Sequence, residues 1–325
     1  MINRTQEDIM KNWNMSEIDT PLVSVKCMTY NQEKYIGQCI DGFLMQKTSF
    51  PFEILIHDDC STDNTTDIVL AYAKKFPKII KPILEDENQY SKHDGSHHKK
   101  IDAAIKGKYI ALCEGDDYWI DENKLQMQVD FLEKNPEYGL TYTLARIFLQ
   151  EKKRFSNQKA GRRFISYEDY FVNGNCFPTL TICFRKDLYE KYLCDIPEYD
   201  RHVWKMGDLP LGLWFSKNSK IKYFAKTTSV YRVLSESASH STDINKIKVF
   251  NESSYEIREY FINKYGNREL LEQYKIGELL YRFWQDNDVD QFLQCYTQFK
   301  YKTLLLRLKK IICCNGLLYK KLYKK

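Results

Sequence analysis

The stretch Tyr109-Ile-Ala-Leu-Cys-Glu-Gly-Asp-Asp-Tyr-Trp119 decides the fold of this chain. Its first part, Tyr109 to Cys113, is short, apolar and compatible with β-structure, so it predicts a buried strand. Three carboxylates follow, on Glu114, Asp116 and Asp117. Ligands of open α/β sheets bind outside the carboxyl ends of the strands, and we therefore expect these acids to lie where a charged ligand is held.

The three carboxylates repel one another unless a cation lies between them. Oxygen ligands of this kind suit Mg²⁺ or Mn²⁺, which take one or two carboxylates and complete their coordination with substrate phosphates. The alternative is a turn whose acids cap the helix that we predict to begin near Asn123. These residues alone leave both interpretations open.

The segments that precede this stretch alternate between strand and helix patterns. Strands are predicted at 22–28, 52–57 and 79–84, and helices at 32–46, 68–76 and 97–106. Four strands separated by three helices predict a largely parallel sheet with helices on both faces. The second strand ends at Asp58 and Asp59, and parallel topology places this pair at the same sheet edge as Asp116 and Asp117.

Composition and motifs limit the class of protein. The chain has 325 residues, enough for one large domain with an appendage or for two domains. It has neither a dinucleotide-binding glycine fingerprint nor a P-loop, and we expect no nucleic-acid partner. Its ten cysteines are scattered and several lie in apolar runs, which favours reduced thiols in a cytosolic protein. We expect neither a signal peptide nor a membrane span. His93, His97 and His98 form a cluster in a polar segment, for which we predict no metal role.

Three motifs in order resemble those of the family 2 glycosyltransferases, which have the GT-A fold. They are Val23-Ser-Val-Lys-Cys-Met-Thr-Tyr-Asn31, Ile56-His-Asp-Asp-Cys-Ser-Thr-Asp63 and Gly107-Lys-Tyr-Ile-Ala-Leu-Cys-Glu-Gly-Asp-Asp-Tyr-Trp119. Together they span about the first 140 residues. The resemblance implies an α/β fold of the GT-A type, Rossmann-like, with a mainly parallel sheet and helices on both faces, and a nucleotide-diphosphate sugar donor such as a UDP-sugar.

The resemblance also implies roles for single residues at the nucleotide. Thr29, Tyr30 and Asn31 would lie along it, Asp59 would accept a hydrogen bond from the uracil ring, and Asp116 would approach the ribose. Asp117 would hold Mn²⁺ or Mg²⁺ on the diphosphate. Glu114 stands where many relatives carry the first acid of an Asp-x-Asp-type motif, and its direct ligation of the metal stays open.

Asp208 is the candidate catalytic base in the second half. It precedes an apolar helix that Pro210 can begin at its first turn, so simple N-capping is the alternative role. In the resembling family an acid at this place takes the proton of the acceptor hydroxyl. Direct displacement needs no enzyme nucleophile and would give an inverting transferase.

A loop near residues 229–240 resembles the family segment that closes over the diphosphate. Arg232 is a candidate phosphate donor, although it could instead pair with a structural acid. The chain departs from the family at Leu234, where relatives carry a histidine. A metal or phosphate role cannot pass to a leucine, and His240 is a candidate substitute.

We divide the chain into an N-terminal arm (1–20), a glycosyltransferase domain (21–242) and a helical C-terminal region with a basic tail (243–325). The domain comprises a nucleotide-sugar half (21–120) and an acceptor half (121–242). From Lys300 onward the chain has nine Lys or Arg residues and no acid. This tail predicts a basic amphipathic helix, which could lie on an anionic membrane at the cytoplasmic face or pack against the helical region.

These observations predict an inverting, metal-dependent, hexosyltransferase-like enzyme of cell-surface polysaccharide synthesis, with a glycan or lipid-linked acceptor. One alternative is a sugar-nucleotide pyrophosphorylase, which needs a glycine-rich basic loop that is not visible between Met28 and Lys34. The other is a catalytically inactive carbohydrate-binding or scaffold protein on the same sheet. Asp117 and Asp208 argue against it, whereas Leu234 keeps it open.

Overall fold

The structure is a computed structural model that describes residues 4–92, 94–174, 176–197, 204–234, 243–286, 288–302, 306–307 and 309–310. The chain packs as two compact units. The first comprises Met1–Phe164 and Asn175–Ser254, and the second comprises Ile165–Gly174 and Tyr255–Lys325. The domain boundaries predicted at residues 20 and 242 stay predictions.

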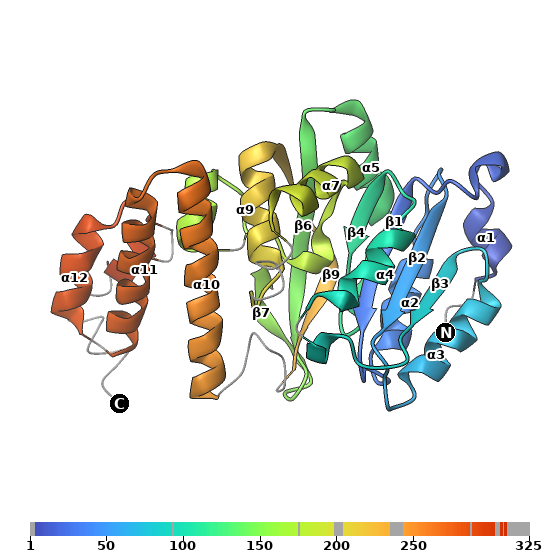
Figure 1. Ribbon diagram of the computed structural model, residues 1–325, viewed down its shortest axis with the longest axis horizontal. Helices are drawn as coiled ribbons and strands as arrows, with labels where there is room; N and C mark the ends of the chain where they lie inside the picture. Colours follow the sequence, from blue (N-terminus) through green and yellow to red (C-terminus); the bar gives the residue numbers. More distant parts are fainter. Residues whose placement is uncertain are drawn as a thin grey trace. The chain divides into compact units, whose positions relative to one another are not determined.

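The first unit is an α/β structure (Figure 1). Its strands are β1 (Val23–Thr29), β2 (Phe52–Asp58), β3 (Ile80–Leu84), β4 (Tyr109–Leu112), β5 (Tyr118–Trp119), β6 (Tyr138–Leu149), β7 (Arg154–Ala160), β8 (Cys183–Arg185) and β9 (Lys220–Val233). Its helices are α1 (Gln6–Met10), α2 (Ile36–Leu44), α3 (Thr65–Lys75), α4 (Ser96–Ala104), α5 (Lys124–Lys134), α7 (Lys186–Asp195) and α9 (Asp208–Asn218).

The strands form one sheet in the order β3-β2-β1-β4-β8-β6-β9-β5, with β7 paired to β6. Strands β3, β2, β1 and β4 are parallel, as the sequence predicts, whereas β8 runs antiparallel to both of its neighbours. The carboxyl ends of β1, β2 and β4 therefore meet at one edge. This edge carries both Asp pairs.

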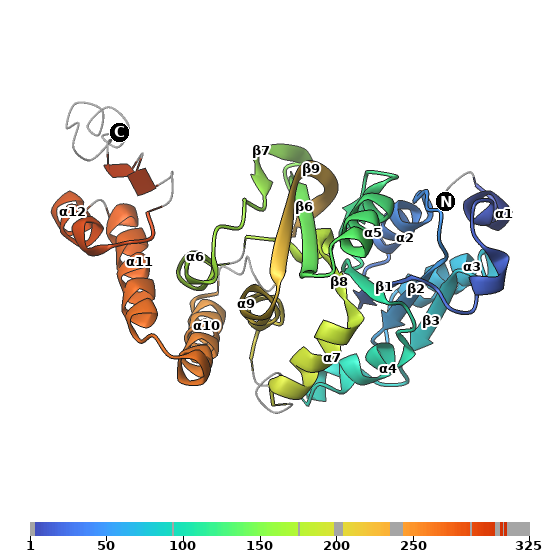
Figure 2. The same ribbon diagram turned by 90° about the horizontal axis from the view of Figure 1, so that it is seen from above.

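Helices cover both faces of the parallel strands. Figure 2 shows α2 and α5 on one side of the sheet that contains β1 and β2, and α4 and α7 on the other. Val23, Val25 and Cys27 alternate along β1 toward the side of α2 and join a fully buried apolar core. The intervening residues, among them Lys26, face α4 and α7, because successive side chains of a strand point to opposite faces.

In the second half, local sequence patterns predict strands at 140–144, 146–150, 178–184 and 221–224, and the structure corrects each of them. The strands expected at 140–144 and 146–150 are one strand, β6, with an irregularity in its pairing. The strand expected at 178–184 begins with a 3₁₀ turn at Thr179–Thr181 and continues as β8. The strand expected at 221–224 extends to residue 233 as β9. Long-range pairing of β6 with β9 explains this extension, since local sequence does not encode it.

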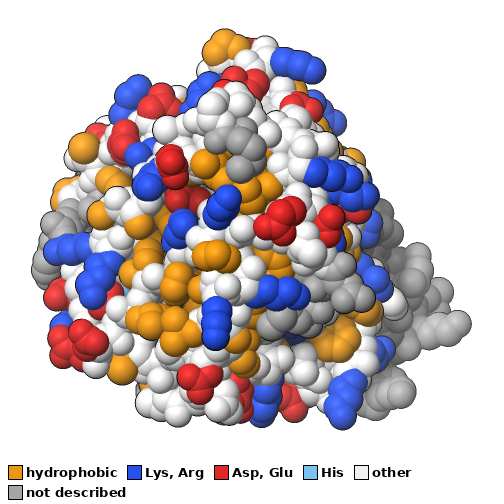
Figure 3. Space-filling view, turned by 90° about the vertical axis from the view of Figure 1, so that its right-hand side faces the viewer, with side chains coloured by type: hydrophobic (Ala, Val, Ile, Leu, Met, Phe, Trp, Pro, Cys, Tyr) orange, Lys and Arg blue, Asp and Glu red, His pale blue; other side chains and the backbone are white. Residues whose placement is uncertain are grey.

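Strand β3 closes one edge of the sheet. Figure 3 views the face over this edge, where hydrophobic side chains gather among scattered Lys, Arg, Asp and Glu side chains. Pro82 lies in the middle of β3 and lacks an N–H to offer to another strand, and Lys81 is exposed beside it. Proline and lysine on an edge strand oppose edge-to-edge pairing.

The second unit is helical. It contains α6 (Tyr167–Asn173), α11 (Glu269–Gln285), α12 (Val289–Gln298) and the C-terminal part of α10 (Ile244–Tyr265). Arg258 is buried there, donates from Nε to the carbonyl of Phe171 at 2.7 Å and lies over the ring of Tyr274. None of the described helices has the length and apolar character needed to cross a membrane. The cysteines in the described ranges carry free thiols, as expected.

Helix α2 approaches the backbone of β5 closely at Gly42. A Cβ atom added there would lie 2.8 Å from the nitrogen of Trp119 and 2.9 Å from its oxygen. Trp119 is buried, packs edge-on against Phe43 at 4.7 Å, and donates from Nε1 to the carbonyl of Leu180 at 2.9 Å. The segment from Glu114 to Asp117 is called the acidic turn below. Only glycine at position 42 therefore lets α2 pack against the backbone of Trp119, just after this turn.

Replacing Gly42 by alanine should destabilise the protein by about 1 to 3 kcal/mol, because the backbone of Trp119 must shift. Gly37→Ala in the same helix is the matched control, since the nearest atom to its added Cβ is the Tyr72 hydroxyl at 3.8 Å. That control should leave stability unchanged or raise it by up to about 1 kcal/mol. Urea unfolding measures both variants, and equal stabilities would refute the close-approach argument.

Candidate active site

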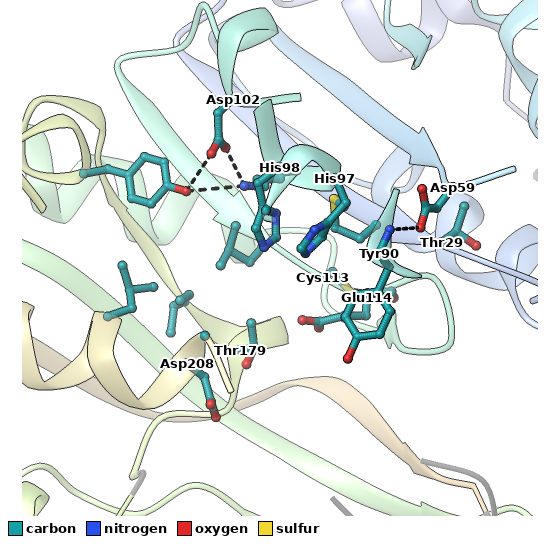
Figure 4. Close-up of a pocket in the computed structure, with 18 of the residues that line it drawn as sticks. Thr29, Asp59, Tyr90, His97, His98, Asp102, Cys113, Glu114, Thr179 and Asp208 are labelled. Carbon is teal, nitrogen blue, oxygen red and sulfur yellow. Dashed lines mark hydrogen bonds and ion pairs between the residues drawn. The ribbon is translucent and has the colours of Figure 1, made fainter. Parts of the chain in front are cut away.

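A pocket of about 820 Å³ lies at the carboxyl edge of β1, β2 and β4 in the first unit (Figure 4). The helices α4, α7 and α9 contribute further parts of its wall, as do Phe177, Thr179 and Ile182. Six of the predicted site residues line it, namely Thr29, Tyr30, Asp59, Glu114, Asp116 and Asp208. The structure therefore brings together the nucleotide residues predicted from the first half and the base predicted from the second.

The loop after β2 fixes Asp59 at the pocket wall. Its side chain is buried and accepts backbone hydrogen bonds from Gln89 at 2.7 Å and Tyr90 at 2.9 Å. Thr29 accepts the Asp59 N–H at 3.1 Å through its carbonyl, which joins the ends of β1 and β2. These contacts hold a carboxylate where the sequence places it.

Asn31 performs a structural task in this conformation. Its φ of 51° lies in the left-handed region, and its side-chain oxygen accepts the Thr62 N–H at 2.7 Å. Among the described residues, Asn31 is not one of those that line the pocket. It ties the loop after β1 to the loop after β2, and its predicted contact with a nucleotide stays a prediction.

The acidic turn divides its carboxylates between two directions. Glu114 and Asp116 line the pocket, whereas Asp117 is 3% exposed and accepts the Arg232 N–H of β9 at 2.7 Å. The turn is also bonded to β1, because Gly115 donates its N–H to the carbonyl of Met28 at 3.0 Å.

Burial disfavours the charged forms of all three acids, and repulsion by neighbouring acids adds to this effect for Glu114 and Asp117. Burial, followed by the charge of Asp116, raises the pKa of Glu114 to about 7. Burial also raises the pKa of Asp116, and burial with the charges of Asp116 and Glu114 raises the pKa of Asp117 well above its usual range. A divalent cation at this turn would remove that repulsion.

The oxygen donors of the turn fit a hard divalent cation, which takes one or two carboxylates and leaves positions for phosphates. Within the described ranges, however, no three His, Cys, Asp or Glu side chains are grouped so as to hold a metal ion. His240, the predicted substitute ligand, lies outside the described residues.

Arg232 clamps the acidic turn to β9. Its guanidinium donates to the carbonyl of Asp116 and to Oε1 of Gln38, and it lies 4.5 Å above the ring of Tyr118. The side chain is buried and is not among the described residues that line the pocket. These contacts give Arg232 a structural role, and its predicted role as a phosphate donor stays a prediction.

Asp208 is the first residue of α9, and Gly207 is the N-cap. Asp208 is therefore not the N-cap that the alternative interpretation requires. Its Oδ1 accepts the N–H of the next residue, Leu209, at 2.9 Å, and the half-buried side chain lines the pocket. The pocket-facing position is the one that a base acting on an acceptor hydroxyl requires.

The sequence interpretation missed several polar residues of the pocket wall. Lys26 pairs with Asp102 at 2.5 Å, and both line the pocket, as do His97 and His98 of α4. The two imidazole rings lie 4.0 Å apart. A signal for Lys26 was available, because it is the one charged residue in the apolar strand 22–28.

Comparison with known proteins places these features in a family context. The family model described as Glycosyl transferase family 2 matches residues 24–193. An uncharacterized protein of Mycobacterium tuberculosis is 32% identical over 237 residues, which cover 70% of this chain and 63% of that protein. The chain thus spans less than two thirds of that relative.

A second relative carries a specific name. The UDP-Glc:alpha-D-GlcNAc-diphosphoundecaprenol beta-1,3-glucosyltransferase WfgD of Escherichia coli is 34% identical over 118 residues, 36% of this chain and 44% of that enzyme. The match lies within a shorter part of the chain than the match to the mycobacterial protein.

Solved structures share the fold. S. aureus TarS 1-349 in complex with UDP-GlcNAc superposes with a TM-score of 0.59 and 18% identity, covering 84% of this chain and 79% of that chain. The mannosyltransferase PcManGT from Pyrobaculum calidifontis in complex with GDP-Man and Mn²⁺ gives a TM-score of 0.50 and 16% identity, with 86% of each chain covered. The expected GT-A type α/β fold is confirmed by these likenesses.

Proposed function

The chain belongs to glycosyl transferase family 2, and on that premise we propose that it moves a sugar from a nucleotide-diphosphate donor to a hydroxyl group of an acceptor. The observation that carries this proposal is that four of the candidate site residues line the same pocket. Asp59, Glu114 and Asp116 follow strands of the first half, and Asp208 begins α9 in the second half. We propose a UDP-linked donor, with support from the UDP-GlcNAc bound to S. aureus TarS, a protein of the same fold.

We assign the nucleotide end of the pocket to the loops after β1, β2 and β4. Asp59 would accept from the base, Thr29, Tyr30 and Asn31 would lie along the nucleotide, and Asp116 would approach the ribose. A divalent cation, Mn²⁺ or Mg²⁺, would supply neutralisation of the diphosphate as negative charge grows on it during departure. Asp117 with Glu114 would hold it, and the Mn²⁺ in PcManGT supports this assignment.

Asp208 would act as the general base. A hydrogen bond from the Leu209 N–H fixes one oxygen of its carboxylate. The carboxylate would take the proton of the acceptor hydroxyl while that oxygen attacks the anomeric carbon and the nucleotide diphosphate leaves. One displacement without an enzyme nucleophile inverts the anomeric configuration.

The acceptor is proposed to be a glycan or a lipid-linked sugar in cell-surface polysaccharide synthesis. The name of the Escherichia coli relative, which specifies a diphosphoundecaprenol-linked acceptor, supports this class. We also propose peripheral attachment of the basic tail to anionic lipid at the cytoplasmic face. Most of this tail, beyond Lys302, lies outside the described residues.

Asp208→Asn should bind the donor normally and lose sugar transfer by roughly 10² to 10⁴, because the amide cannot take the acceptor proton. Its stability should stay within about 0.5 kcal/mol, since asparagine keeps an oxygen for the Leu209 N–H. Two quantities are measured for each variant, namely the rate of sugar transfer to a pool of acceptors and the affinity for UDP by calorimetry. The exposed Asp187→Asn in the first turn of α7 is the matched control. Full transfer by Asp208→Asn would remove the base assignment.

Asp117→Asn should lose at least about a hundredfold of the Mn²⁺-supported hydrolysis of nucleotide sugars, because an essential charge is removed. Asparagine preserves the acceptor for the Arg232 N–H, so the fold should survive. Asp116→Asn, made in parallel, should weaken nucleotide binding and keep the metal requirement. If wild-type turnover persists in excess chelator, the metal has no role. Nucleotide binding without any turnover would favour the inactive binding protein.

The full-length chain should sediment with anionic vesicles at low salt and release at high salt. Replacing Lys320, Lys321, Lys324 and Lys325 by glutamine should lower the bound fraction at least tenfold, since each lysine near an anionic surface contributes about 1 kcal/mol. Neutral phosphatidylcholine vesicles are the control. Sedimentation of neither protein at low salt would exclude the membrane proposal.

A further inference from the structure

An ion pair forms part of the pocket wall at the side formed by α4 and α7. Lys26 Nζ of β1 lies 2.5 Å from Asp102 Oδ1 of α4, with the two side chains 7% and 17% exposed. Tyr189 of α7 donates its hydroxyl to Asp102 Oδ2 at 3.1 Å and lies 3.4 Å from Lys26 Nζ. Figure 4 shows the labelled Asp102, with dashed lines that mark the contacts of its carboxylate. Three elements thus converge on one polar point of the pocket.

Packing alone gives no reason for charges at this place. Taking an ammonium and a carboxylate out of water is costly, and an apolar pair of similar size is often as stable. Lys26 also lies over the Tyr189 ring at 5.6 Å, so its position is fixed from two sides. Binding of a polar ligand in the pocket would explain why an ion pair lies here, whereas packing does not explain it.

The pair retains hydrogen-bonding capacity toward the pocket. An ammonium has three donors, of which Lys26 directs two to Asp102 and Tyr189. A carboxylate has about four acceptor sites, and Asp102 uses one on each oxygen. A donor and acceptors that lie side by side match the adjacent hydroxyl groups of a sugar ring. Because the two charges cancel, the matching sugar is uncharged.

The location is one sugar ring away from the acidic turn. Lys26 pairs in register with Leu112 of β4, and Glu114 follows two residues later. At about 3.3 Å per residue the backbone of Lys26 lies about 7 Å before that of Glu114 along the strand direction, roughly the length of one pyranose. Tyr192, Leu193 and Leu211 supply apolar wall on this side, against which the C–H face of a sugar can pack.

We propose that Lys26, Asp102 and Tyr189 form the specificity site for the donor's sugar and select an uncharged hexose over a hexuronate. The inference rests on the proposed function and names the substrate class of the same pocket. A carboxylate on the sugar would face Asp102 and find Lys26 already neutralised, whereas the hydroxyl groups of a neutral hexose find both a donor and an acceptor.

The test compares Lys26→Met and Asp102→Asn with the wild type in Mn²⁺-supported hydrolysis of UDP-glucose, UDP-galactose, UDP-N-acetylglucosamine and UDP-glucuronate. Both variants should bind UDP itself within about twofold of the wild type and lose at least tenfold in kcat/KM for the preferred neutral sugar. Asp102→Asn leaves an uncompensated cation, so its ratio of UDP-glucuronate to neutral-sugar turnover should rise at least tenfold. Glu122→Gln, which breaks the exposed pair with Lys47, should change nothing.

Tyr189→Phe covers the case in which the charge variants fail to fold. It removes only one hydroxyl and should lower neutral-sugar turnover severalfold with UDP binding intact. Variants that keep the wild-type sugar preference would overturn this inference alone, as would a wild type that prefers UDP-glucuronate. A wild type that neither binds UDP nor hydrolyses any of the four sugars would overturn the proposed UDP-sugar function and this inference with it.

Discussion

The site depends on the attachment of the acidic turn to β9. Arg232 uses its backbone N–H for the buried Asp117 carboxylate and its guanidinium for the Asp116 carbonyl. Three carboxylates that burial and repulsion push toward protonation would otherwise move apart into solvent. The clamp fixes the turn so that Glu114 and Asp116 face the pocket, and the remaining electrostatic strain is the property that a divalent cation would relieve.

The pocket uses two kinds of charge arrangement for two tasks. At the acidic turn, three carboxyl groups lie close together and the guanidinium of Arg232 donates to the backbone carbonyl of Asp116, an arrangement that suits binding of a metal with a diphosphate. At Lys26 and Asp102, opposite charges already cancel, which suits an uncharged polar ligand. Asp208 approaches from α9, with one oxygen held by the Leu209 N–H. One cavity thus offers separate environments for the nucleotide, the sugar and the proton to be removed.

The first half of the chain could be predicted because its information is local. Short apolar strands followed by Thr29, Asp59 and Glu114 identify a sheet edge, and parallel topology brings these residues together. The second half could not be predicted in the same way. Its strands β6, β8 and β9 pair with partners that are far away in the sequence, and local patterns indicate only fragments of these strands. Lys26 and Asp102 are 76 residues apart, and no spacing rule connects a lysine in a strand with an aspartate in a later helix.

The bond between Arg232 and Asp117 joins residues 115 positions apart, which has a consequence for assembly. Contacts of such high sequence separation form slowly, because the intervening chain must first be ordered. During synthesis the parallel strands and their motifs emerge well before β9. In a nascent chain, the parallel strands can therefore form their sheet edge early. The acidic turn becomes ordered only later, when β9 pairs with β6 and β5. Completion of the ligand site is a late event that reports on correct folding of the whole sheet.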